Sequence, residues 1–354
     1  MKYLKITVAV LACAAIFLGA QRLLMPKYMA GIYEGALIAE YYDEQKPVDV
    51  LILGDCEVYA NFSPITLWEN YGITSYIRGG PQQLIWHSYY LLEDVLRREK
   101  PAVVVFNVLA MQYDTPQREG YNRLNIDGMK LSAVKLAAAN ASMLEGESLL
   151  SYVFPLLRFN ERWSEISTED FEYYFKKDRV SVSGFMVRCD VKPVEIIPEG
   201  RRLVDYSFGE NSSKYLDKLT DLCKREGIEL VLVKAPTIYP HWYAQWDAQM
   251  VDYAQEHGLI YINYLDIVDE LGIDFSTDTY DAGLHLNVYG AEKLSEHFGN
   301  MLSDFVPDRR GEPEYDAIWE DKARAYNYLK ETQEREIAET GKINTFTYSL
   351  EDVG

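Results

Sequence analysis

The sequence predicts an α/β fold in which a five-stranded parallel sheet is covered by helices on both faces. Five short apolar runs alternate with segments of helical pattern, an order typical of parallel sheets whose strands are buried on both sides. The runs are 48–53, 73–78, 102–108, 229–235 and 259–264. With 354 residues, 48% of them hydrophobic, the chain is long enough to bury the core that such a sheet requires.

The segments between and after these runs predict the helices. They lie at 64–71, 82–98, 212–226, 242–257 and 291–305. Gly72, Gly227 and Gly258 follow three of them, at the position where glycine ends a helix because it adopts a left-handed conformation without strain. We therefore expect three of the helices to end at these glycines.

The chain is predicted to divide into three parts. Residues 1–27 form a signal peptide or membrane anchor, 45–306 form the α/β domain, and 307–354 form a charged helical extension with Trp319, Tyr326 and Leu329 as its sparse apolar points. Within the domain, the stretch from about 120 to 205 breaks the alternation and is too long for an ordinary loop. We interpret it as a helical insertion, with a lid as one possible role.

The N-terminal segment predicts that the rest of the chain is exported. Lys2 and Lys5 precede an apolar run from Ile6 to Ala20, the pattern of a signal peptide or a marginal membrane span. An uncleaved anchor is the favoured interpretation, because the apolar stretch continues beyond Cys13, where a lipoprotein signal would be processed. The expected location is the cell membrane, single-pass and with the domain outside the cytoplasm, or secreted.

Charge and motif content argue against several classes of partner. The formal net charge of −20 would repel phosphate backbones, so nucleic acid is not an expected partner. The spacing of His87, His241, His257 and His297 is not that of metal ligands. The sequence contains neither the GxxxxGK(S/T) phosphate-binding loop nor the GxGxxG dinucleotide-binding turn. We expect neither a metal nor a cofactor.

Two distant segments hold the candidate reactive groups. The first apolar run leads into Gly54-Asp55-Cys56-Glu57, and Asp281 to Asn287, with His285 between them, precede Gly290. A strand that ends at a small residue, an acid and a nucleophile delivers its side chain to the carboxyl edge of the sheet, where open α/β folds keep their sites. Cys56 is the candidate nucleophile and His285 the candidate base.

These segments resemble the SGNH (GDSL-like) hydrolase superfamily. The resemblance covers the five-strand core and implies a three-layer α/β/α sandwich of flavodoxin-like arrangement. It also implies an oxyanion site made by Cys56, Gly79 and Asn107. The chain departs from the family in two ways, because the family nucleophile is serine and its acid lies three residues before the histidine, where this chain has Ala282.

Asp281 lies one residue earlier than the family acid and is the candidate that orients His285, provided that the loop bulges; Asp278 is the alternative. Asp55 and Glu57 flank Cys56, and their charges would disfavour a thiolate there, although a thiol at a helix N-terminus near a histidine can ionise at neutral pH. Each role has a plain alternative. His285 would be a loop residue bonded to backbone, Gly79 part of a turn and Asn107 a strand-end amide.

The expected substrate is an acylated glycan or another ester. Tyr239, Trp242 and Tyr243 follow the fourth run at the same predicted sheet edge, where their rings would stack on sugars or pack a helix start. We expect an acyl esterase or O-acyltransferase acting on a cell-envelope glycan through Cys56. The alternatives are a non-catalytic glycan-binding or envelope-assembly protein with a degenerate site, and a cytosolic thioesterase.

Overall fold

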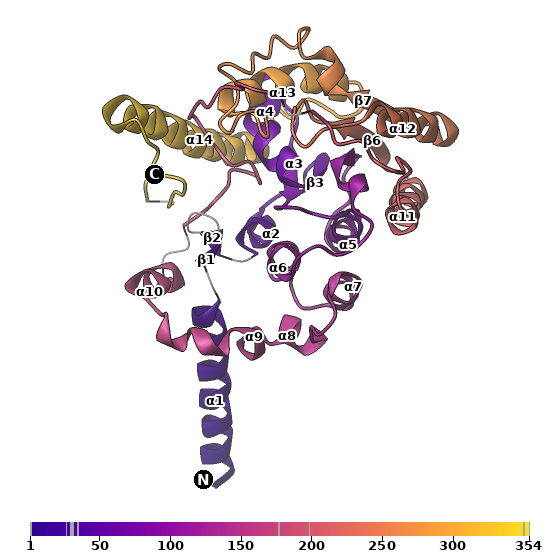
Figure 1. Ribbon diagram of the computed structural model, residues 1–354. Coiled ribbons are helices and arrows are strands. Elements are labelled where there is room, and N and C mark those ends of the chain that lie inside the picture. The colour runs from indigo at the N-terminus through magenta and orange to yellow at the C-terminus, as the bar shows by residue number, and fades with distance from the viewer. Residues whose placement is uncertain are drawn as a thin grey trace.

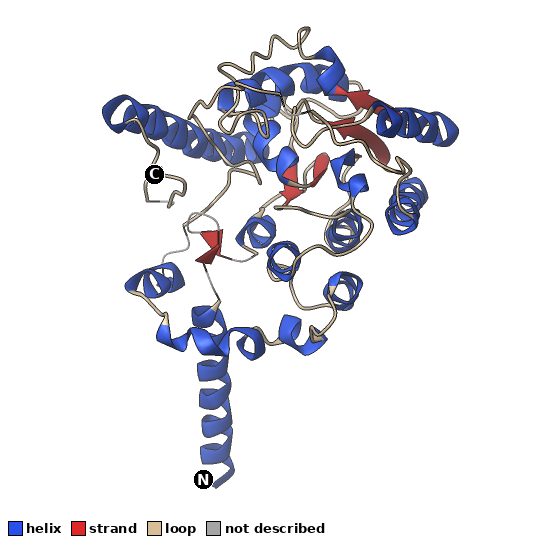
Figure 2. Cartoon of the chain, viewed as in Figure 1, coloured by secondary structure: helices blue, strands red, loops and turns tan. Residues whose placement is uncertain are grey.

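The computed structural model describes residues 2–25, 27–28, 32–33, 35–175, 178–197, 199–349 and 351–353. It confirms the predicted fold class, since its central five-stranded sheet is wholly parallel and is flanked by helices on both faces (Figures 1 and 2). The strands are β3 (Val50–Gly54), β4 (Ser75–Gly79), β5 (Val103–Asn107), β6 (Glu229–Lys234) and β7 (Ile260–Asn263). Their order is β4-β3-β5-β6-β7, the flavodoxin-like order of second, first, third, fourth and fifth.

The continuous apolar character of the strands follows from the pleat. Val50 and Ile52 of β3 belong to the core on one face of the sheet, and Leu51 and Leu53 to the core on the other. Successive side chains point to opposite faces, so a strand covered on both sides is mainly apolar. Its polar exceptions, such as Arg78 of β4 and Lys234 of β6, are buried together with an acidic partner. The apolar pattern is why all five predicted strands coincide with observed ones to within one or two residues at each end.

Helices from distant parts of the chain cover the two faces. One face packs α3 (Cys56–Asn61), α4 (Pro64–Tyr71), α13 (Val288–Leu302) and α14 (Pro313–Thr340); the other packs α5 (Ile85–Val95), α7 (Ala133–Ser142), α11 (Glu210–Glu226) and α12 (Ala244–His257). Gly72, Gly227 and Gly258 end α4, α11 and α12 with φ of 68°, 67° and 67°. The three predicted helix ends are confirmed.

Short elements complete the described chain. They are β1 (Lys27–Tyr28), β2 (Ile32–Tyr33), α2 (Ala36–Glu40), η1 (Tyr41–Asp43), η2 (Val108–Gln112), α6 (Glu119–Ile126), α8 (Leu149–Val153), α9 (Leu156–Phe159), η3 (Asn160–Ser164), α10 (Thr168–Phe175) and η4 (Tyr264–Ile267). The stretch predicted as an insertion is thus helical from α6 to α10. Residues 178–197 and 199–205 contain no helix.

The C-terminal helix α14 packs into the core of one face. Its Trp319 is buried and stacks on Trp68 of α4, with ring centroids 5.3 Å apart and planes 15° from parallel. The buried Gln333 side chain accepts from the Cys189 N–H at 3.0 Å and donates to the Val187 carbonyl at 3.0 Å. Most charged residues of α14 are exposed, its apolar residues extend the core, and its partly buried Lys322 and Lys330 pair with Glu44 and Glu292.

The N-terminal helix α1 (Lys2–Leu24) projects from the rest of the molecule (Figure 1). Its residues Tyr3–Leu24 are long and apolar enough to cross a membrane, judged by length and composition. The same pattern occurs in signal sequences, so the helix agrees with either form of the predicted N-terminal segment.

Candidate active site

Cys56 lies where β3 passes into α3, at the carboxyl edge of the sheet. Asp55 caps α3, because its side chain accepts from the Glu57 N–H at 3.2 Å, and Cys56 is the first helical residue. The half-buried Cys56 lines a cavity of about 220 Å³. The other residues around this cavity are Asp55, Glu57, Tyr59, Pro81, Gln82, Leu109, Gln112, Tyr113, Tyr121, Pro240, Leu284 and His285.

The structure brings His285 to the same cavity, and the Asp281 carboxylate is hydrogen-bonded to His285. His285 Nδ1 lies 2.6 Å from Asp281 Oδ2, and the His285 backbone N–H donates to Asp281 Oδ1 at 2.8 Å. Both carboxylate oxygens therefore hold this residue. Asp278, the alternative orienting acid, instead pairs with Lys293 at 2.6 Å and accepts from the Asp274 N–H at 2.8 Å.

The backbone between Asp281 and His285 explains how an acid four residues before the histidine reaches it. Ala282 and Gly283 have φ of 64° and 92°, two successive left-handed residues that turn the loop back on itself. Thr279 fastens this turn, because its hydroxyl donates to the His285 carbonyl at 2.7 Å and accepts from the Gly283 N–H at 2.8 Å. The loop bulges in the way that an Asp281 role requires.

The thiol and the imidazole influence each other electrostatically. Burial raises the pKa of Cys56 above its ordinary value, while the nearby His285 ring lowers it. Burial lowers the pKa of His285, but Cys56 and the hydrogen bond to Asp281 outweigh burial and raise that pKa well above its usual value. Cys56 raises the pKa of His285 only when it is a thiolate, so this effect belongs to the thiolate–imidazolium pair and not to a neutral thiol beside a neutral ring. Because Nδ1 is engaged by Asp281, the buried Nε2 is the ring nitrogen left for the thiol.

The surroundings of Cys56 contain both features that favour a thiolate and features that oppose it. The helix that begins at Cys56 has only six residues. Burial raises the pKa of the thiol by more than this short helix and the His285 ring lower it. Burial therefore opposes the thiolate, and transfer of the thiol proton to a neutral His285 ring would activate Cys56.

The two acids beside Cys56 are largely compensated. Glu57 is buried and pairs with the equally buried Lys234, whose Nζ lies 2.9 Å from Oε1, and Glu57 also accepts from the Thr237 hydroxyl. Burial, together with the Glu57 charge, raises the pKa of Asp55 to about 7. The negative charge next to the thiol is consequently smaller near neutral pH than the sequence suggests.

The three expected oxyanion donors are not equally placed. The Cys56 N–H is at the first position of α3, where a helix supplies no acceptor. Gly79 pairs with Gly54 across the sheet, and a Cβ added to it would lie 2.4 Å from Val58 and 3.3 Å from the Asp55 carbonyl, so it lies against the turn that carries Cys56. Asn107 donates to Glu57 at 2.7 Å and Asp55 at 3.2 Å, and an oxyanion role would require it to release one of them.

The three aromatic candidates for sugar binding also differ. Tyr239 is exposed and precedes Pro240, which lines the cavity. Trp242 is buried in the core beside Trp246, and the Tyr243 hydroxyl donates to the Arg201 carbonyl at 2.6 Å while its ring packs on Trp246. Of these rings, Tyr239 is the one with a face free for a ligand.

Several residues at this site were not anticipated from the sequence. Tyr280 stacks on the His285 ring, with centroids 5.5 Å apart and planes 9° from parallel. Gln82 lines the cavity with a φ of 49°, which is rare outside glycine and recurs at functional sites. Lys234 could have been found, because a charged residue that directly continues a buried apolar run requires a buried partner.

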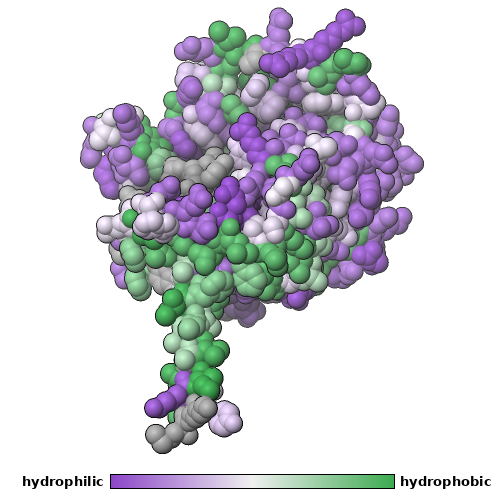
Figure 3. Space-filling view, turned by 60° about the horizontal axis from the view of Figure 1, so that its bottom comes forward, coloured by the Kyte–Doolittle hydropathy of each residue, from purple (hydrophilic) through white to green (hydrophobic). Residues whose placement is uncertain are grey.

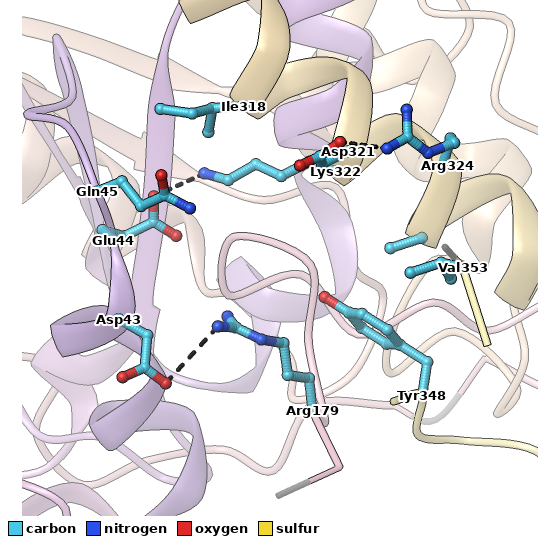
Figure 4. A pocket seen from close by; sticks show the side chains of 11 residues that line it. Asp43, Glu44, Gln45, Arg179, Ile318, Asp321, Lys322, Arg324, Tyr348 and Val353 are labelled. Atoms are coloured by element: carbon cyan, nitrogen blue, oxygen red, sulfur yellow. Dashed lines mark hydrogen bonds and ion pairs between the residues drawn. The ribbon is translucent and has the colours of Figure 1, made fainter. Parts of the chain in front are cut away.

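A second cavity, of about 330 Å³, lies away from Cys56 between η1 and α14 (Figure 4). Its charged side chains are paired with one another: Lys322 lies 2.7 Å from Glu44, and Arg179 lies 3.7 Å from Asp43. These pairs connect the C-terminal helix to the α/β core. None of its lining residues is a cysteine, serine or histidine, so the site at Cys56 remains the candidate for acyl-transfer chemistry.

Comparisons with known proteins do not show the family of this chain. No family model and no curated protein matches the chain. Among solved structures, a protein from Bacteroides fragilis, provisionally described as an acylhydrolase, is similar over 75% of this chain and 95% of its own, with 12% sequence identity and a TM-score of 0.37. A likeness at this level does not establish a common activity.

Proposed function

We propose that the protein is an acyl esterase or O-acyltransferase that uses Cys56 as its nucleophile, His285 as its general base and Asp281 to orient the base. One observation carries the proposal. Asp281 holds His285 through two hydrogen bonds, at 2.6 and 2.8 Å, beside the Cys56 thiol at the same cavity. This order of nucleophile, base and orienting acid is the general arrangement of nucleophilic acyl transfer.

In the proposed first step, an ester carbonyl enters the cavity and Cys56 Sγ attacks its carbon. His285 takes the thiol proton as the C–S bond forms, so the raised pKa of Cys56 does not prevent attack. The carbonyl oxygen becomes an oxyanion, which the N–H groups of Cys56 and Gly79 would stabilise. Asp281 then stabilises the imidazolium that His285 has become.

In the second step, the tetrahedral intermediate collapses to a thioester on Cys56. His285 returns its proton to the departing alkoxide, which leaves as an alcohol. Water or a sugar hydroxyl next attacks the thioester, His285 accepts the attacking proton, and the Cys56 thiolate departs and is reprotonated. The acyl group leaves as a carboxylic acid or as a new ester.

The size and lining of the cavity favour a small acyl group. Cavities that enclose whole drug-sized ligands measure about 300–1,000 Å³, and this one is about 220 Å³. Its walls are mainly aromatic and aliphatic, with Tyr59, Tyr113 and Leu284 among them. We infer that the acyl group enters and the alcohol part remains near the mouth, where Tyr239 offers an exposed ring for a glycan.

We further propose that the domain works outside the cytoplasm on a neutral cell-envelope glycan. Lys2 and Lys5 at the start of α1 favour a cytoplasmic N-terminus. The net charge of −20 makes a polyanionic acceptor unfavourable.

The test is turnover of p-nitrophenyl acetate by the full-length wild type and three variants. We expect Cys56→Ala and His285→Ala to reduce kcat by at least about 100-fold, and Cys56→Ser to retain measurable turnover. Mass spectrometry of the acid-quenched wild type should find an acetyl group on the peptide that contains Cys56.

Cys223→Ala is the matched control, since Cys223 is buried on the other face and its pKa is raised by burial to about 12. It should turn over ester as the wild type does. Equal rates in wild type, Cys56→Ala and Cys56→Ser would exclude the enzyme and favour the non-catalytic glycan-binding protein.

A further inference from the structure

Exposed apolar side chains gather on the helices that follow α7. They come from α8, α9, η3 and α10 and the short links between them, and their exposed fractions run from 40% to 80%. We call this group the apolar collar: Leu150, Phe154, Leu157, Trp163, Phe171 and Phe175. Figure 3 shows hydrophobic surface around the base of α1, and Figure 1 shows these helices where α1 joins the globular part.

The collar is attached to the apolar helix α1. The Arg162 guanidinium donates to the carbonyls of Leu24 at 2.9 Å and Met25 at 2.6 Å, which have no partner within the helix at its C-terminal end. Phe17 of α1 contacts Phe154, with ring centroids 5.8 Å apart. α1 and the collar therefore form one connected apolar surface.

The length of α1 sets the depth of the collar. Residues 3–18 of α1 are exposed, whereas residues 19–21 and 23 are half-buried, Arg22 is exposed and Leu24 is buried. Sixteen helical residues extend about 24 Å, which is short of the roughly 30 Å of a bilayer's hydrocarbon core. A membrane-spanning α1 must therefore also bring its last turns, and the collar around them, to the boundary of the hydrocarbon layer.

We propose that the apolar collar is a membrane-docking surface, seated in the interfacial layer of the bilayer that α1 crosses. The partner is lipid with electrically neutral headgroups, since a net charge of −20 opposes anionic ones. Exposed Phe and Leu with one Trp is the composition of interfacial segments, which bury about 5–10 Å into the headgroup boundary.

This assigns the greater part of the insertion to the membrane and not to a lid. Of its helices, α6 contributes Tyr121 to the wall of the Cys56 cavity, whereas no collar residue lines that cavity. The proposal also favours a retained α1, because cleavage would leave the collar without the helix against which it packs. It does not depend on the proposed reaction.

Trp163 allows a direct test, because it is 72% exposed while the other five tryptophans are each below 9%. Full-length wild type and Trp163→Phe are placed in phosphatidylcholine nanodiscs, and the difference in their emission isolates Trp163. We expect lipids brominated near the glycerol end of the chain to quench this difference more strongly than lipids brominated near the chain terminus. Aqueous acrylamide should quench it several-fold less than it quenches free N-acetyltryptophanamide.

A second pair of variants separates the collar from apolar surface in general. Leu157→Glu, in the collar, should raise acrylamide quenching of Trp163, and Val251→Glu, an exposed apolar position on α12, should leave it unchanged. Trp163 fully open to acrylamide and untouched by brominated lipid would overturn the proposal. Shielding from both quenchers would also overturn it, because a second copy or another protein would then cover the collar.

Discussion

The surroundings of Cys56 show how one residue can lie between two acids and still be a candidate nucleophile. The Glu57 carboxylate is paired with Lys234, whose Nζ lies 2.9 Å from Glu57 Oε1. Burial, together with the Glu57 charge, raises the pKa of Asp55 to about 7. What remains against ionisation of the thiol is mainly burial itself. In the proposed mechanism, attack by Cys56 therefore depends on His285 accepting the thiol proton as the C–S bond forms.

The first prediction concerns the acid that orients His285. Asp281→Asn removes the charge that stabilises the imidazolium, and we expect kcat for p-nitrophenyl acetate to fall about 10²–10⁴-fold with little change in KM. Asp278→Asn is the matched control. The Asp278 carboxylate accepts from Lys293 and from the Asp274 N–H. This variant should therefore have a lower free energy of unfolding, measured in urea, and an unchanged kcat. The reverse result would transfer the orienting role to Asp278.

A second residue-scale prediction concerns acid stability. Burial lowers the pKa of His87 to about 3, so the folded protein keeps this ring neutral while the unfolded chain protonates it below its ordinary value of 6.5. The unfolded state then binds more protons, and His87 makes the free energy of unfolding decrease as pH falls from 6.5 towards 3. The contribution reaches about 2–3 kcal/mol near pH 4.5.

His87→Gln tests this, because glutamine can still accept from the Leu84 N–H, which His87 Nδ1 does at 3.1 Å, but does not titrate. Urea unfolding at several pH values should give a shallower loss on the acid side than the wild type shows. Parallel pH profiles for the two proteins would contradict the assignment.

At this scale the sequence predicted which residues meet but not how they are engaged. Cys56 and His285 line one cavity, and Asp281 reaches His285 through the left-handed Ala282 and Gly283, a conformation that no spacing rule reveals for alanine. The burial of Trp242 and the engagement of Asn107 depend on side chains from other elements. Such packing is decided by tertiary structure and leaves no local pattern.

At the scale of elements, the sheet strands could be predicted from the sequence because they are buried on both faces. Each sheet strand is an apolar run because both faces are covered, and three helices end at glycines whose left-handed conformation no other residue adopts as easily. The six-residue α3 was not predicted, since it is too short to show periodicity. The role of α8–α10 was not predicted either, because their apolar residues face outward.

The third prediction tests how α14 is held. Trp319→Ala removes the ring that stacks on Trp68, and we expect the full chain in detergent to lose about 3–5 kcal/mol of unfolding free energy in urea. Asn327→Ala, at an exposed position on the same helix, should change it by less than about 0.5 kcal/mol. Equal small effects would mean that α14 is not part of the cooperative core.

At the scale of the whole molecule, the charge of −20 should select among substrates. An anionic ester such as p-nitrophenyl succinate is repelled at low salt, and NaCl screens this repulsion because the Debye length shrinks to about 10 Å at 0.1 M. We expect kcat/KM for the anionic ester to rise with NaCl while that for p-nitrophenyl acetate stays nearly constant. A ratio that falls with salt would indicate a locally cationic entrance.

The two hydrogen bonds from Arg162 attach η3, and with it the apolar collar, to the end of α1. In a membrane-anchored form, this attachment would restrict rotation of the domain about α1 and hold the mouth of the Cys56 cavity at a nearly fixed height above the lipid. Such a protein would search by lateral diffusion in two dimensions. Its substrates would be those esters whose glycan chains extend to the height of the cavity mouth. The distance from the membrane would then contribute to substrate specificity in addition to contacts within the cavity.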